Sequence, residues 1–460
     1  MDWRRVAIVS LLSLVAFAGI GSAHQIQTSR FAAPIPLEFL FGGAGVTVAA
    51  TAVWLGRTGE ASSMRRTWRS HPAIPATLAT ALRYGVRAVF FIGFLVAVFQ
   101  GLFGPQVAAE NFATVFVWAV WFEGVSLVSI LIGSPWRILS PWCTLYEGLT
   151  WLESDEIALF GSYPSWLGSW PALFGFVVGI GIFGNLTVIP RSPAATAVII
   201  AGYATVMVVG GVVFGEEWFR YADALSVLYR LFGRVAPIRF VEADGGYRVA
   251  LRPPWAGCTR RVRTLSLVSF VIATVYTVSF DGFTNTPEYQ TVLFGLRDAL
   301  DSGPTTSVLV YAIGLCGFVV AFVAVSEAMS RVAGEGRQWR NVALAFAPTV
   351  LPIAAAYEVA HNYPFVLGSL GRLAALAWSM SFSPVEPITL LSWLSLPVFW
   401  GSQVILIIAG HIIAVVAAHT VAVERYETLT RARQAHLPLV ALMVGYTVLS
   451  LWIISRPVVS

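Results

Sequence analysis

The chain has 460 residues, of which 57% are apolar and only 12% are charged, and its formal net charge at pH 7 is +5. Soluble proteins carry about 25% charged residues, so this composition excludes a soluble enzyme, a repeat solenoid and a disordered tail. It indicates a polytopic membrane protein. In such a protein a basic excess more often sets orientation than binds nucleic acid. We therefore expect a lipid bilayer, and no nucleic acid, as its partner.

The N-terminus has the three parts of a secretory signal. Arg4 and Arg5 precede an apolar stretch from Val6 to Ile20, and the small residues Gly21-Ser22-Ala23 follow. Signal peptidases cut after small residues in this position. We predict a signal peptide over 1–23 and a mature chain that begins at His24. An uncleaved anchor over the same residues is the alternative, because a short apolar core can still insert.

Ten further stretches are long and apolar enough to span a bilayer. They cover 37–56, 86–104, 112–134, 171–189, 193–215, 264–281, 306–326, 342–369, 397–422 and 437–456. The prediction is an all-α transmembrane helix bundle of about ten spans, with 24–460 as a single transmembrane domain.

Arginine predicts the orientation of this bundle. All 29 basic residues are Arg. When residue 24 is placed outside, the predicted cytoplasmic loops contain 22 of them, the outer loops contain five, and two lie in the signal. Basic residues accumulate in cytoplasmic loops. We therefore expect a multi-pass protein of the plasma membrane with both mature termini outside.

The longest predicted cytoplasmic loop, 216–263, is too short to fold around its own core. Its Asp244-Gly245-Gly246 lies between two short apolar runs and predicts a β-hairpin. Just before it, Trp218 to Leu231 has the apolar spacing and the cationic residues of a helix on the inner membrane surface. A similar aromatic-rich stretch from Pro135 to Trp151 follows the third span, and its tryptophans are typical of a headgroup belt.

Ionisable residues inside predicted spans are candidate functional residues, because a buried charge is costly in the bilayer. Glu123 lies in the third span and is either a proton carrier or a buried neutral acid. Glu358 and His361 share one face of the eighth span, in its outer half. Glu-x-x-His is also the spacing by which di-metal carboxylate bundles hold a metal. The plainer alternatives are a hydrogen bond from Glu358 to a neighbouring helix and a water-filled vestibule around His361.

Two more spans carry candidate residues. His411 and His419 are eight residues apart and share one face of the ninth span. Asp281 ends the sixth span at the outer surface, and the following Gly282-Phe283-Thr284-Asn285-Thr286-Pro287 is predicted to be a turn whose polar groups satisfy the helix end.

A copper hypothesis follows from the predicted cleavage. The free amino group and imidazole of His24 form a chelate, and imidazole is a favoured copper ligand. His24 would lie outside, on the same side as Asp281, Glu358 and His361. An outer copper site leading to a path of His411, Glu123 and His419 is then a coherent prediction, and a chance histidine at position 24 is the alternative. A bis-His haem would need His361 and His411 at one depth, and their predicted depths differ, so haem is less favoured.

Several short motifs together resemble those of a known family. They include Ser134-Pro135-Trp136-Arg137, Glu217-Trp218-Phe219-Arg220, Arg252-Pro253-Pro254-Trp255, the segment 281–287, Ala360-His361-Asn362-Tyr363 and Gly410-His411. The chain resembles polytopic membrane proteins of archaea and actinobacteria that are labelled fenitrothion hydrolase. The resemblance implies organophosphate hydrolysis.

A hydrolase site is only partly supported by the residues themselves. The sequence contains no Gly-x-Ser-x-Gly and no His-Glu-x-x-His, and it has no Lys for a phosphate loop. A metal pair that activates water could come only from His24, Asp281, Glu358 and His361.

Three functional hypotheses follow. The leading one is a membrane protein that binds a transition metal, copper favoured, and transports it or hands it to or from a donor or acceptor protein. The second is a membrane-embedded, metal-dependent hydrolase. The third is a non-catalytic partner of a respiratory complex.

Overall fold

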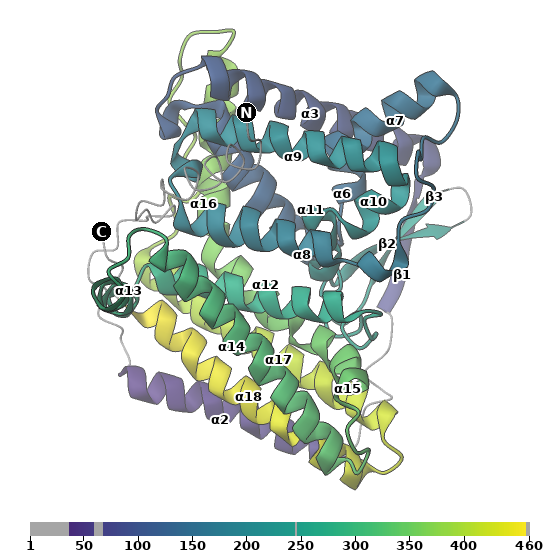
Figure 1. Ribbon diagram of the computed structural model, residues 1–460, viewed down its shortest axis with the longest axis vertical. Coiled ribbons are helices and arrows are strands. Elements are labelled where there is room, and N and C mark those ends of the chain that lie inside the picture. The colour runs from purple at the N-terminus through teal and green to yellow at the C-terminus, as the bar shows by residue number, and fades with distance from the viewer. Residues whose placement is uncertain (1–35, 59–67, 244–245, 457–460) are drawn as a thin grey trace.

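The computed structural model describes residues 36–58, 68–243 and 246–456 (Figure 1). The predicted signal at 1–23 and His24 lie outside these residues. Within them, nine helices are long and apolar enough to cross a membrane, and a shorter apolar helix covers Trp170–Gly184. These ten segments correspond to the ten predicted spans, so the all-α polytopic bundle is confirmed. The lipid bilayer is the partner that such apolar helices require.

Eight of the spans contain one long α-helix. These are α2 (Leu37–Thr58), α3 (Ala76–Phe103), α9 (Pro193–Phe214), α12 (Leu265–Thr284), α14 (Thr306–Val332), α16 (Leu351–Ser379), α17 (Leu396–Arg425) and α18 (Leu429–Ser455). The span of α16 begins earlier, with α15 (Trp339–Phe346) and the 3₁₀ helix η7 (Ala347–Val350).

Two further spans contain a π-helix. The third consists of α4 (Phe112–Thr114), the π-helix η3 (Val115–Gly124) and α5 (Val125–Ile132). The short apolar span consists of α8 (Trp170–Phe176) and the π-helix η5 (Val177–Gly184). The connecting elements are η2 (Ala108–Glu110), α6 (Trp136–Leu139), α7 (Pro141–Glu153), η4 (Ser165–Leu167), η6 (Ile189–Arg191), α10 (Glu216–Tyr221), α11 (Ala224–Phe232) and α13 (Pro287–Leu300).

The span that contains α16 is the most enclosed of the nine. In its most apolar window 83% of residues are buried inside the protein, compared with 11% in α14. Figure 1 shows α2 beside α18 at one edge of the bundle and α3 beside α9 at the other. Glu358, in the enclosed first half of α16, is 7% exposed and so faces protein rather than lipid.

The predicted hairpin is present and belongs to a larger sheet. Strands β2 (Ile238–Ala243) and β3 (Gly246–Leu251) pair antiparallel, with Ile238 opposite Leu251. A further strand, β1 (Trp68–Pro75), pairs with the other edge of β3 and was not predicted. The sheet joins the loops that follow the first and fifth predicted spans. Those two loops therefore lie on the same side of the bundle, as the alternating topology requires.

Other contacts agree with this alternation. Arg425 is paired with Glu335 at 2.8 Å between the loops at the far ends of α17 and α14. The Val262 backbone N–H donates to the Leu344 carbonyl, which connects the long loop to α15. At the opposite end of the bundle, Arg456 is paired with Glu288. The arginine bias predicts that the side with the sheet faces the cytoplasm.

The expected surface helix from Trp218 to Leu231 is interrupted at Asp223. The part after Asp223, α11, is buried in the bundle rather than lying on the membrane surface. Trp136 and Trp142 were expected in a headgroup belt, but they are 2% and 1% exposed. Both donate their indole N–H to Asp223, at 2.8 and 2.9 Å. This buried carboxylate accounts for the burial of α11 and of the two tryptophans, because it binds both indoles and a backbone N–H in the first turn of α11.

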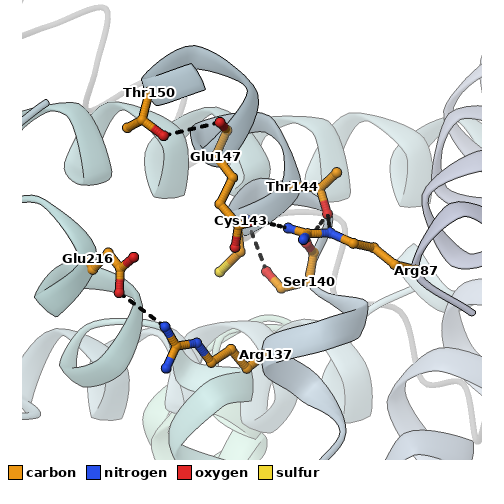
Figure 2. A network of polar contacts seen from close by, with 8 residues as sticks. All are labelled: Arg87, Arg137, Ser140, Cys143, Thr144, Glu147, Thr150 and Glu216. Atoms are coloured by element: carbon orange, nitrogen blue, oxygen red, sulfur yellow. Dashed lines mark hydrogen bonds and ion pairs between the residues drawn. The ribbon is translucent and has the colours of Figure 1, made fainter. Parts of the chain in front are cut away.

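A polar network attaches α7 to α3 near the sheet (Figure 2). Arg87 of α3 donates to the Thr144 hydroxyl and is paired with Glu147 at 2.6 Å. Ser140 caps the start of α7 by accepting the Cys143 backbone N–H. Because the contacts of Arg87 join α3 to the aromatic stretch after the third span, they fix that stretch in place.

Candidate functional site

Glu123 lies on the last turn of the π-helix η3. A π-helical turn displaces the regular backbone pairing, and such turns are frequent at functional sites. The Tyr229 hydroxyl of α11 lies 3.3 Å from both the Trp121 and the Phe122 carbonyl oxygens, and donates to them. The buried α11 therefore supports the backbone directly beside Glu123.

A cavity of about 60 Å³ lies beside this turn. Both π-helices contribute to its wall, through Phe122 and Glu123 of η3 and through Ile180 and Gly184 of η5. The cavity also brings together four of the predicted site residues, which come from three different spans: Glu123, Asp281, Glu358 and His361. A volume of this size holds a few water molecules or one ion with its ligands.

The polar side chains of this pocket bond to one another. The Asn362 amide Nδ2 donates to Glu123 Oε2 at 2.9 Å. The carboxyl groups of Glu358 and Glu123 lie close enough to interact directly, and the Ser126 hydroxyl lies beside Glu358. Two carboxyl groups can hydrogen-bond only when one of them holds a proton. A hydrogen bond between Glu123 and Glu358 would therefore need a proton on one of them.

His361 and Asp281 form a second pair at the cavity. His361 Nε2 lies 3.1 Å from Asp281 Oδ2. The imidazole also stacks on Tyr357, with ring centroids 6.1 Å apart. The Tyr357 hydroxyl reaches over Gly282, where an added Cβ would lie 2.2 Å from its oxygen. Only glycine fits at position 282, so the residue after Asp281 keeps this aromatic support in place.

The polar turn after the sixth span serves the purpose expected of it. The Asp281 carbonyl accepts from the Thr284 hydroxyl and the Asn285 amide. Thr286 then caps α13 by accepting the Tyr289 backbone N–H. The helix ends at Thr284 rather than at Asp281, so Asp281 lies in its last turn and its side chain faces the cavity.

The charges of the pocket do not balance. It contains three carboxyl groups and one imidazole, and no described residue that lines it is an arginine. Glu358 is only 7% exposed. Negative charge in a low-dielectric site is costly unless a cation or a proton neutralises it. The pocket is therefore suited to cations.

The other predicted histidines lie elsewhere. His411 Nδ1 is hydrogen-bonded to the Ile407 carbonyl at 2.9 Å, and its ring lies against Tyr446. His419 lies against His436, a residue to which the sequence analysis assigned no role. Because His361 is paired with Asp281 and His411 lies against Tyr446, these two imidazoles do not face each other as a bis-His haem requires.

Within the described residues, no group of three or more His, Cys, Asp or Glu side chains is arranged to hold a metal ion. Two pairs make up the acidic part of the pocket, Glu123 with Glu358 and His361 with Asp281. His24, the proposed chelate, lies outside the described residues and stays a prediction.

Sequence reasoning missed the groups that hold the site together. Ser126 and Asn362 are neutral, and Tyr229 and Asp223 belong to a loop expected at the surface. The available signal was position: Asn362 follows His361 directly, and Ser126 lies three residues after Glu123 and so on the same helical face. Asp223 is the one acid between two apolar runs of α10 and α11.

Comparison with known proteins finds no matching family model, no similar curated protein and no similar solved structure.

Proposed function

We propose that this chain is a membrane protein that binds a transition-metal cation in the pocket of Glu123, Asp281, Glu358 and His361, and transports it or hands it over. The observation that carries the proposal is the unbalanced charge: three carboxyl groups and an imidazole around one small cavity inside a helix bundle. Carboxylate and imidazole are both ligands of divalent metals such as zinc, manganese, iron and copper.

The pairing of these groups also favours a cation. A carboxylate that is hydrogen-bonded to a ligating imidazole orients the ring and raises its basicity, as Asp281 could for His361. A proton held between Glu123 and Glu358 could be replaced by a cation. Copper stays the favoured ion if His24 begins the mature chain, since the amino-terminal chelate would then lie at the outer side.

The proposal is tested on protein purified without a histidine tag. Cu(II), Zn(II) and Mn(II) are titrated separately, and the bound metal is measured by elemental analysis after desalting. Glu358→Gln and His361→Gln are expected to weaken binding of the preferred ion by at least about tenfold, since each removes one direct ligand. Glu386→Gln, on the exposed loop before α17, is the matched control and should bind as wild type. Absence of any bound cation, or equal binding by all four proteins, would exclude the proposal.

A membrane-embedded hydrolase is the second candidate. It is favoured by the 3.1 Å contact of His361 with Asp281, which resembles a base with its orienting carboxylate. It is disfavoured by size, because pockets for drug-sized organic ligands measure about 300–1,000 Å³, whereas this cavity measures about 60 Å³. Phosphotriester turnover that is lost in Asp281→Asn would support the hydrolase over the cation-binding protein.

A further inference from the structure

Two buried histidines lie together outside the pocket. His419 of α17 is 1% exposed and His436 of α18 is 3% exposed. Their ring centroids are 5.4 Å apart. Neither residue lines the cavity of Glu123 and Glu358. By the arginine bias, this pair is close to the cytoplasmic end of both helices.

The hydrogen bonds of the pair leave nitrogen lone pairs available. His436 Nδ1 is bonded to the Ala432 carbonyl at 2.6 Å, so the proton is on Nδ1 and Nε2 carries a lone pair. Both nitrogens of His419 are buried and have no hydrogen-bond partner among the described residues. Burying an imidazole in this state costs free energy unless another atom binds it. The pair therefore has two imidazole nitrogens free to act as ligands.

The surroundings of the pair restrict what it can bind. The neighbouring positions on the two helices are small and buried, and their side chains supply no further ligand atom: Ala417, Ala418, Ala422, Ala432 and Ala435. The groups that act electrostatically on His419 are His436 and Arg433, and no carboxylate is among them. Because repulsion from a guanidinium grows with the charge of the bound ion, a monovalent ion is favoured over a divalent one.

The ring geometry fits a two-coordinate metal. A metal between two imidazole nitrogens at about 2 Å from each places the ring centroids about 6 Å apart when the three atoms are in line. The observed 5.4 Å, with an angle of 59° between the rings, places both imidazoles within reach of one ion, and rotation of the side chains would align one nitrogen of each ring with it. Neutral imidazoles are copper ligands, and a site without carboxylates does not favour hard cations.

We propose that His419 and His436 form a second metal site, which takes a monovalent copper ion, Cu(I). This site is independent of the outer pocket and uses a different ligand set. It extends the proposed function with a distinct binding step at the other end of α17.

The experiment measures Ag(I), an air-stable monovalent analogue, on tag-free protein after desalting. Wild type is expected to retain one silver ion per chain more than His419→Gln or His436→Gln. Silver bound by the three cysteines is common to all the proteins and cancels in this difference. His411→Gln is the matched control, because His411 is on the same helix and is equally buried.

A spectroscopic measurement on the wild-type protein tests the site even if the variants fail to fold. The X-ray absorption spectrum of wild type loaded with one Cu(I) should show a first shell of two nitrogens, and His419→Gln should lose it. His361→Gln should leave both Ag(I) retention and this spectrum unchanged, so loss of divalent binding at the pocket is distinguished from loss of this site. Equal silver retention by wild type, His419→Gln and His436→Gln, or a sulfur-only shell in wild type, would overturn the proposal.

Discussion

Asp223 is the most heavily hydrogen-bonded side chain described in this bundle. One carboxylate oxygen accepts from the indoles of Trp136 and Trp142, and the other accepts from the Tyr203 hydroxyl and the Leu225 backbone N–H. A buried charge is tolerated when its oxygens are fully satisfied in this way. Asp223 therefore fixes α11 against the aromatic stretch after the third span, and α11 in turn supports the backbone at Glu123.

Asp223→Asn is expected to destabilise the protein by about 1–3 kcal/mol, because the new amide group faces two donors and leaves them unpaired. Thermal unfolding in detergent measures the loss. Asp298→Asn removes the same charge from an exposed position on α13 and should leave the midpoint unchanged. An Asp223→Asn midpoint equal to that of wild type would show that this hub does not stabilise the fold.

At the scale of elements, close packing holds α10 against α9. α10 packs on α9 at Gly210, where an added Cβ would lie 2.0 Å from the Trp218 ring. Gly210→Ala should therefore lower the free energy of unfolding by about 1–3 kcal/mol, because the added methyl group overpacks this contact. Gly202, on the same helix, has nothing within 4 Å of its ideal Cβ. Gly202→Ala should be neutral or stabilising by up to about 1 kcal/mol, the gain in helix propensity. The measurement is the thermal unfolding midpoint of each variant in the same detergent. Equal midpoints for Gly210→Ala and Gly202→Ala would contradict the close contact at Gly210.

At the scale of the whole molecule, the prediction concerns which side of the membrane each loop occupies. In a Cys316→Ser background, Glu386→Cys should react with an impermeant maleimide in intact cells, whereas Arg337→Cys should react only after permeabilisation. These positions are exposed and lie in loops predicted on opposite sides. The reverse pattern would overturn the assignment of the sheet to the cytoplasm.

The background should stay unlabelled for a physical reason. Burial raises the pKa of Cys143 to about 12 and that of Cys258 to about 12, from 9.0. Maleimides react with the thiolate, and three pH units reduce the thiolate fraction about a thousandfold below that of an ordinary cysteine. Labelling of the background below pH 9 would show that one of these thiols is accessible. Above pH 12 both would ionise and the reagent would lose its selectivity.

The sequence by itself determined the membrane class, the ten spans and which loops share a side. These follow from local quantities, namely apolar length and the distribution of arginine, so no long-range contact is needed to predict them. It also identified Glu123, Asp281, Glu358 and His361 as candidates, because a charge in an apolar span is costly wherever the span packs.

Only the tertiary structure decided which candidates meet. Glu123 and Glu358 are separated by more than two hundred residues, and their contact depends on how the third and eighth spans pack. The π-helical turns, the burial of α11 and the pairing of His419 with His436 also depend on neighbours distant in sequence. Helical periodicity gives the face on which a residue lies, but packing between helices determines which faces meet.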